Sequence, residues 1–428
     1  MKMHPWVYYG WTLLAMSAVS MFIIYGLRYS FSVFYVSILN EFGWSRADTA
    51  LIFSVNVIIY GLTAPVAGGL VDRFGPRVVL PLGALLLGLG AIASSQANAI
   101  WQFMALYGVV MALGISAAGF VPHSAIIANW FVRKRGAAFA ILTAGFGASY
   151  LMGTVAQGLI STMGWRNAFI ALGLLMVVLV VPLEVLLQRR HPRDKGLLPD
   201  GDSAPAADDA PAQARQRSTV VDEKWVKTEW NLKKALKTYR FWGLFAALFF
   251  MWGMSINLVI AHQVIFAVDI GFTGAFAASI YGMYGVAYAS GNLCGFISDR
   301  IGREVTVTVG IAIGMLGIGM LFLASLGHPA PWMLYFYSIA FGFGGGLFSP
   351  SITASVADLF QGKHFGAIYG FTVMGFGIGG AFSPWLGGLI HDLTGSYSLA
   401  FGLVIFFMAI AALSVWIAAP RRVRRWTA

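Results

Sequence analysis

The sequence predicts an all-α polytopic membrane protein in which twelve transmembrane helices form two pseudo-symmetric six-helix bundles. Charged residues make up only 11% of the chain, less than half of the share of about 25% that is typical of soluble domains. Apolar runs of about 20 residues recur along it, and each is long enough to cross a hydrocarbon core of about 30 Å as a helix. The third observation is an internal repeat, which divides the spans into two sets of six.

The apolar runs predict helices rather than strands or coil, because every backbone polar group in lipid must pair within its own segment. Their bounds, good to a few residues, are 8–38, 47–71, 78–96, 100–130, 137–161, 167–188, 241–268, 276–298, 305–326, 332–357, 366–390 and 398–419. We expect no cleavable signal peptide, because the first span continues from MKMHPWVYYGW without a small-residue cleavage site.

The positive charge of the chain is distributed by side. The net charge is +11, yet 25 of the 28 Lys and Arg residues fall at the termini or in loops on one side of the predicted spans. This positive-inside pattern places both termini in the cytoplasm and predicts a multi-pass protein of the cell's inner (plasma) membrane. The basic excess therefore indicates topology, and nucleic acid is not an expected partner. The single cysteine, Cys294, excludes an intrachain disulfide.

Two loops show that the halves of the chain are related. GGLVDRFGPR, residues 68–77, follows the second span, and GFISDRIGRE, residues 295–304, follows the eighth. An offset of about 230 residues also relates four glycine pairs of the fifth and eleventh spans: Gly136 with Gly366, Gly145 with Gly375, Gly147 with Gly377, and Gly158 with Gly388. We therefore expect a first bundle over 1–188, a cytoplasmic linker over 189–240 and a second bundle over 241–428.

The linker has two parts of different composition. Residues 198–220 are rich in Ala, Pro and Asp with almost nothing to bury, which predicts disorder. Residues 225–240 place Trp230, Leu236 and Tyr239 among lysines, which favours a cationic amphipathic helix on the inner leaflet. The alternative is a charged linker that serves only the topology.

Both repeated loops resemble the signature loop of the major facilitator superfamily. The matching residues are Gly68, Asp72, Arg73 and Gly75 in the first copy, and Gly295, Asp299, Arg300 and Gly302 in the second. The resemblance covers essentially the whole chain and implies a two-bundle transporter. Asp and Arg at helix ends can pair and so latch the bundles in one state. The expected gating residues are Asp72, Arg73, Asp299, Arg300, Arg133 and Arg135; the alternative is ordinary loop charges.

Two further stretches resemble monocarboxylate transporters. WFVRKRGAAFAILTAGFG, residues 130–147, is similar to their fifth-span signature, although its basic cluster also fits positive-inside charge alone. The segment beginning GLRYSFSVFYV is similar to bacterial members and to the related oxalate–formate antiporters. One feature departs from the group: animal members carry an Asp and an Arg four residues apart in the eighth span, where this chain has Ala287 and Gly291.

Arg28 is the only Lys or Arg inside any predicted span. An Arg at the centre of a span costs about 2.5–3.5 kcal/mol on insertion scales, and Arg28 lies too deep for easy snorkelling to the surface. The resemblance implies that the first span lines a central cavity, and animal relatives place a lysine close to this position. We expect Arg28 to bind the substrate carboxylate. The alternative is a structural arginine bonded to backbone carbonyls.

Other polar residues are candidates for the same site. The repeat places Asn257 of the seventh span opposite Arg28, and substrates bind between pseudo-symmetric sites in such folds. Tyrosines three or four residues apart lie on one face of the eighth span. Each of these residues also fits helix packing or an interfacial belt. The additional substrate-binding candidates are Asn257, Tyr281, Tyr284, Tyr288, His262, His123 and Tyr60.

The expected function is secondary active transport of small organic anions, in particular monocarboxylates such as lactate, pyruvate or acetate. Proton coupling follows from the resemblance, and a co-transported proton cancels the cost of about 2.3 kcal/mol per charge per 100 mV. Proton-site candidates are His262, His123 and Asp269. The alternatives are carboxylate exchange, which needs no titrating group, and export of hydrophobic compounds. We expect no enzymatic centre, no cofactor, no metal, and function as a monomer.

Overall fold

The computed structural model describes residues 8–131, 135–201, 221–327, 329–360 and 365–423. All secondary structure in these ranges is helical. The helices of the first half are α1 Tyr9–Tyr29, α2 Phe31–Phe42, α3 Arg46–Phe74, α4 Pro76–Ser94, α5 Ile100–Phe103, η2 Met104–Met111, α6 Ala112–Ala118, α7 Phe120–Trp130, α8 Arg135–Ala148, η3 Ser149–Leu151, α9 Met152–Leu175, η4 Met176–Val180 and α10 Val181–Leu187. The short elements that follow are η5 Pro192–Lys195, η6 Pro199–Gly201, α12 Glu223–Lys227 and α13 Leu232–Ala235.

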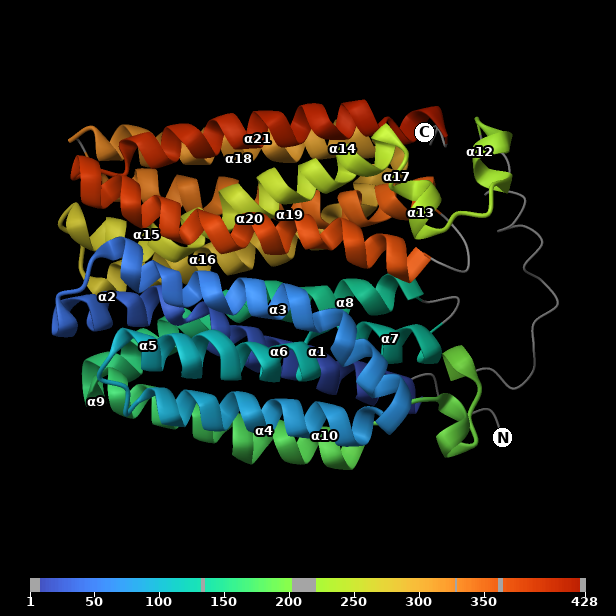
Figure 1. The fold of residues 1–428 in the computed structure, drawn as a ribbon, viewed down its shortest axis with the longest axis horizontal. Coiled ribbons are helices and arrows are strands. Elements are labelled where there is room, and N and C mark those ends of the chain that lie inside the picture. Colours follow the sequence, from blue (N-terminus) through green and yellow to red (C-terminus); the bar gives the residue numbers. More distant parts are fainter. Residues whose placement is uncertain (1–7, 132–134, 202–220, 328, 361–364, 424–428) are drawn as a thin grey trace.

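The second half repeats this arrangement of long helices. Its elements are α14 Tyr239–Leu248, η7 Phe249–Ile256, α15 Asn257–Asp269, α16 Gly274–Leu293, η8 Cys294–Ile297, α17 Ser298–Ile301, α18 Arg303–Ser325, α19 Pro331–Leu359, α20 Phe365–Thr394, α21 Ser398–Ala418 and η9 Pro420–Arg422. In Figure 1 the elements from α1 to α10 lie together in one bundle, and those from α14 to α21 lie in the other.

The predicted twelve passes are confirmed. Within the described ranges, nine stretches are long and apolar enough to cross a membrane. One of them, Ala138–Leu187, holds two passes because Gly164 takes a left-handed conformation (φ 78°) that breaks α9. Helices α3 and α16, of 29 and 20 residues, supply the other two. Long apolar helices that leave no backbone group unpaired are the form that lipid imposes.

The molecule, with its two bundles side by side, has two distinct ends. At one, which we call the basic end, α1 begins, α3 joins α4 and α21 finishes (Figure 1). Its described residues include Arg73, Arg77, Arg300 and Arg303. The opposite end, which we call the far end, carries the connections from α2 to α3 and from α15 to α16.

The linker residues do not form the expected amphipathic helix over 225–240. They form the two short helices α12 and α13, and Asn231 caps the second by accepting from the backbone N–H of Lys234 (2.9 Å). The indole of Trp225 donates to the carbonyl of Leu359 (2.7 Å), and the Trp230 ring meets Phe360 edge-on (5.1 Å). The apolar side chains are therefore docked on the end of α19. Of the segment expected to be disordered, 202–220 lies outside the described residues.

A polar cluster, which we call the far-end latch, joins the two bundles. The Nη1 and Nη2 atoms of Arg46 donate to the carboxylate of Asp269, at 2.5 and 2.9 Å. Asp392 accepts from the backbone N–H groups of Arg46 and Ala47 (3.2 and 2.9 Å), so it caps the first turn of α3 from the other bundle. Tyr397 accepts from Arg46 (3.1 Å). Charge-assisted, bidentate bonds of this kind hold a defined geometry.

Close helix packing extends the contact between the bundles. A Cβ on Gly388 of α20 would lie 2.6 Å from the backbone nitrogen of Ala47, so α3 and α20 touch through their backbones. A Cβ on Gly147 would lie 2.9 Å from Ala289 of α16. Within the second bundle, a Cβ on Gly344 of α19 would overlap the carbonyl of Gly310 in α18. Small residues permit such contacts between membrane helices.

Gly344→Ala should therefore destabilise the protein. Overpacking costs typically about 1–3 kcal/mol, which exceeds the gain in helix propensity of about 1 kcal/mol from replacing glycine. The matched control is Gly319→Ala in α18, where no atom lies within 4 Å of the added carbon. Thermal unfolding in detergent should show a lower midpoint for Gly344→Ala alone. Equal midpoints for the two variants would contradict this packing.

Asp269→Asn should weaken the far-end latch, because it removes the charge that Arg46 contacts. Spin labels at two exposed far-end positions, Gln96 of the first bundle and Leu393 of the second, report the separation of the bundles in a Cys294→Ser background. Pulsed EPR should show a longer-distance population in the variant. The control is Asp48→Asn, an exposed carboxylate in the first turn of α3. Identical distance distributions in Asp269→Asn and the parent would show that the ion pair does not hold this end closed.

Candidate functional site

The candidate site surrounds the junction of α1 and α2 at Ser30. Two backbone carbonyls at this junction accept bonds from tyrosine hydroxyls. Tyr107 donates to the carbonyl of Arg28 (2.5 Å), and Tyr281 of the second bundle donates to that of Tyr29 (2.6 Å). Interrupted helices mark binding sites in membrane proteins, because the freed carbonyls need partners. The Tyr281 hydroxyl thus joins the two bundles at the junction.

The Arg28 side chain is buried, and the residue is 1% exposed. Its Nε, Nη1 and Nη2 atoms have no hydrogen-bond partner among the described residues. The guanidinium carbon lies 4.6 Å from the centre of the Tyr60 ring and 5.7 Å from that of Tyr29, so the cation rests on aromatic faces. No described backbone carbonyl takes the bond that a structural arginine would make. A buried cation with idle donors is costly unless an anion pairs with it.

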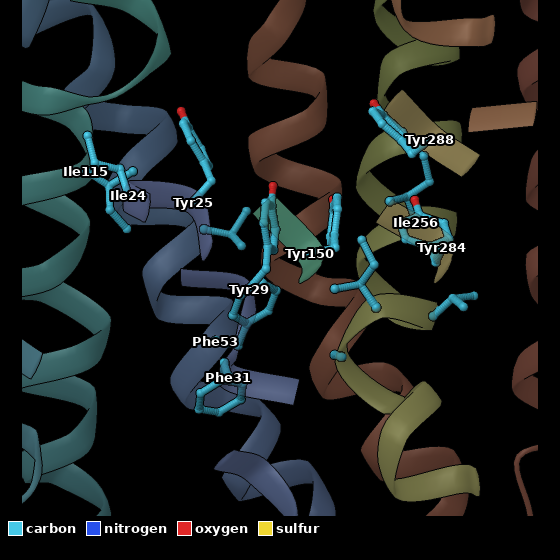
Figure 2. Close-up of a cluster of buried hydrophobic side chains, with 14 of the residues drawn as sticks. Ile24, Tyr25, Tyr29, Phe31, Phe53, Ile115, Tyr150, Ile256, Tyr284 and Tyr288 are labelled. Carbon is cyan, nitrogen blue, oxygen red and sulfur yellow. The ribbon is translucent and has the colours of Figure 1, made fainter. Parts of the chain in front are cut away.

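Tyrosines form the wall beside this arginine. Tyr29 stacks on Tyr150 with ring centres 4.6 Å apart, and Tyr150 meets Tyr284 at right angles (5.0 Å). Figure 2 shows the ring of Tyr150 between Tyr25 and Tyr29 on one side and Tyr284 and Tyr288 on the other. The Tyr284 hydroxyl is buried and has no described partner. The wall therefore combines apolar ring surface with a free donor, as small-molecule sites commonly do.

Asn257 and His262 make other contacts. The Asn257 amide donates to the carbonyl of Trp252 (2.7 Å) in the π-helical segment η7. The His262 Nε2 atom bonds the carbonyl of Pro384 (2.7 Å), and its Nδ1 faces the hydroxyl of Tyr397 (3.1 Å). Because Tyr397 also contacts Arg46, His262 belongs with the far-end latch. The same holds for Asp269, so two of the three proton-site candidates stand at this end.

His123 has a partner that sequence reasoning left out of the site. Its Nε2 atom lies 3.1 Å from Oε1 of Glu184 in α10, and both side chains are fully buried. Glu184 is an acidic residue inside an apolar run with an amide four residues on, Gln188. This pattern could have indicated a functional carboxylate from the sequence, but no local feature of the sequence predicts that the helix carrying His123 packs against Glu184.

The gating candidates are placed unevenly. In the second repeat Asp299 pairs with Arg303 (2.6 Å), which also bonds Asp358 through Nε (3.0 Å); both partners belong to the second bundle. Arg300 instead lies 5.9 Å from the Phe296 ring. Arg73 is exposed beside Phe74. The remaining candidates lie wholly or by their side chains outside the described residues: Asp72, Arg135 and Arg133.

Comparison with known proteins gives relatives along most of the chain. YcxA of Bacillus subtilis, described as an uncharacterized MFS-type transporter, is 26% identical over 90% of this chain and 89% of its own length. Human monocarboxylate transporter 11 is 24% identical over 96% of this chain and 83% of its own. The oxalate:formate antiporter of Oxalobacter formigenes is 24% identical over 88% and 86%. These relatives confirm the predicted resemblance.

Solved structures share the fold. A bacterial homologue of the human lysosomal transporter Spinster, in an inward-facing and unoccupied conformation, superposes with a TM-score of 0.67 over 97% of this chain and 96% of that chain. The identity is 16%, so the likeness is one of fold. The sequence profile of the Major Facilitator Superfamily matches residues 17–340 and 293–428. The chain therefore belongs to the Major Facilitator Superfamily and is a multi-pass membrane transporter rather than an enzyme.

Proposed function

We propose that the protein is a secondary active transporter that binds a small monocarboxylate at Arg28 and carries it with one proton by alternating access. The observation that carries the proposal is the buried guanidinium of Arg28, whose three nitrogens have no hydrogen-bond partner in the part of the chain that the structure describes. Its planar fork matches the two oxygens of a carboxylate. The predicted substrates are lactate, pyruvate and acetate.

Charge and shape support a monoanion. Arg28 is the only Lys or Arg inside the predicted spans, so one carboxylate neutralises the site, whereas a dianion would leave a buried negative charge. The rings of Tyr29 and Tyr60 offer apolar surface to a short carbon chain. The name of one relative, a monocarboxylate transporter, points to this class of substrate, and that of another, an oxalate:formate antiporter, points to small carboxylates more broadly.

The far-end latch supplies the moving part of this proposal. It closes one side by contacts between the bundles. Alternating access would break these contacts, and backbone contacts at Gly388 and Gly147 allow rocking. The positive-inside pattern supports placing the protein in an inner membrane, with the basic end and both termini on the cytoplasmic side. A single chain, which contains both bundles, would function as a monomer.

Exchange of two carboxylates is the second candidate. The name of the Oxalobacter relative favours it, and Arg28 alone would suffice for exchange. Export of hydrophobic compounds has less support, because a buried unpaired cation offers an apolar molecule no favourable partner and repels a cationic one.

Replacing Arg28 tests the anchor. Uptake of labelled lactate, pyruvate, acetate and oxalate is measured in proteoliposomes with and without a pH gradient, against protein-free vesicles. Arg28→Ala should lose at least about 30-fold in uptake, since truncating one partner of a buried charge pair costs about 2–5 kcal/mol. Arg28→Lys keeps the charge without the fork and should raise KM.

The matched control is Lys227→Ala, which removes a cation from an exposed pair with Glu223. Undiminished uptake by well-folded Arg28→Ala would overturn the anchor, and no carboxylate uptake by the parent would overturn the substrate class. Uptake that needs internal carboxylate and ignores the pH gradient would favour exchange.

Arg28→Met gives an independent prediction on stability. Without ligand, replacing an unpaired buried cation by an apolar side chain of similar length should raise the unfolding midpoint, as such replacements are often neutral or stabilising by about 1–4 kcal/mol. Added monocarboxylate should raise the midpoint of the parent but not of Arg28→Met. A lower midpoint for the ligand-free variant would indicate a structural arginine.

A further inference from the structure

A polar cluster lies inside the first bundle, where α1, α7 and α10 meet. The Glu184 carboxylate accepts from the hydroxyl of Ser20 (2.6 Å) at Oε1 and from the amide of Gln188 (2.9 Å) at Oε2. His123 Nε2 lies 3.1 Å from Oε1. All four side chains are 0% exposed. Buried ionisable groups in membrane spans are costly and are typical of functional sites.

The hydrogen bonds fix how many protons this cluster holds. His123 Nδ1 lies 3.0 Å from the carbonyl of Gly119, which only accepts, so Nδ1 carries a hydrogen. Nε2 faces a carboxylate oxygen, and one further proton fits between the two atoms. With that proton the pair is neutral overall, as imidazolium with carboxylate or as imidazole with carboxylic acid. Without it, one uncompensated negative charge stays buried.

Among the described contacts of this cluster, charged side chains lie only toward the basic end. From α1 the cluster meets the hydroxyl of Ser20. Toward the basic end, the guanidinium groups of Arg77 and Arg189 donate to the carbonyl of Gln188 (3.0 and 2.7 Å). The Tyr9 hydroxyl donates to the neighbouring carbonyl of Leu187 (2.5 Å).

A break in the fourth span connects the cluster to Arg28. Gly119 separates α6 from α7 with φ −87° and ψ −150°, and its carbonyl holds His123. The next residue, Phe120, donates its backbone N–H to the hydroxyl of Tyr25 (3.2 Å). That hydroxyl lies 3.1 Å from the hydroxyl of Tyr60, whose ring supports the Arg28 guanidinium. Tyr25 stands on α1 at the edge of the aromatic wall (Figure 2).

We infer that His123 and Glu184 form the proton-binding site that couples proton movement to the carboxylate at Arg28, an inference that rests on the proposed function. The proton binds the imidazole–carboxylate pair, and no bond other than that to hydrogen changes. A carboxylate on Arg28 cancels the positive charge that repels an arriving proton. Substrate therefore tightens proton binding, and by linkage the proton tightens substrate binding to the same extent. The other candidates, His262 and Asp269, are engaged at the far end.

Glu184→Gln separates exchange from net transport. The amide keeps the shape of the carboxylate but stays neutral and cannot release a proton. The empty carrier therefore cannot reach the deprotonated state in which it would return. In proteoliposomes, counterflow of labelled lactate at equal pH should stay within about threefold of the parent. Accumulation driven by an inward proton gradient should fall at least tenfold. In detergent, lactate affinity should vary with pH in the parent and become flat in the variant.

The matched control is Glu41→Gln, which alters a carboxylate bonded to Trp165 and Arg166 at the far end. It should accumulate lactate as the parent does. Accumulation by Glu184→Gln at the level of the parent would overturn the inference, as would equal losses in Glu184→Gln and Glu41→Gln. If Glu184→Gln does not fold, His123→Gln decides by the same split.

Failure of the proposed function would look different. A parent protein that shows neither counterflow nor accumulation of any carboxylate would overturn that function before the variants are compared. A parent that exchanges carboxylates but ignores the proton gradient would overturn the proton site while leaving the Arg28 anchor in place.

Discussion

The central constraint on this protein is a positive charge held in a place where water and lipid cannot neutralise it. Arg28 is buried against aromatic rings, and its guanidinium has no hydrogen-bond partner among the described residues. The chain reaches this geometry by interrupting its first span at Ser30, and tyrosines from both bundles then bond the carbonyls of Arg28 and Tyr29. Hydroxyl donors thus satisfy these two carbonyls, and the ligand proposed for Arg28 would supply the missing partner of the cation.

Ion pairs lie at both ends of the molecule. At the far end Arg46 meets Asp269 and Asp392, so the ionic contacts cross between the bundles. At the basic end Arg303 pairs with Asp299 and Asp358 of the same bundle. Contacts between bundles must break when the bundles separate, whereas those within a bundle move as a unit. In the proposed transport cycle, the contacts of the far-end latch would break when that end opens.

The first bundle also connects its two buried ionisable sites. The break at Gly119 lets one carbonyl hold His123 while the adjacent N–H reaches Tyr25, which neighbours Tyr60 under Arg28. The proposed coupling would act through these contacts, in an interior where low dielectric strengthens electrostatic interactions.

The spans, the repeat and the unusual position of Arg28 could be predicted from the amino-acid sequence, because hydropathy and a lone charge in an apolar run are local properties of the chain. Which side chains meet depends on the packing of the folded protein. Glu184 faces His123, 61 residues away, and Asp269 faces Arg46, 223 residues away. No local pattern encodes such pairs, since the packing of separate helices sets them. For the same reason Trp225 and Trp230, expected on an amphipathic helix, pack against the end of α19 instead.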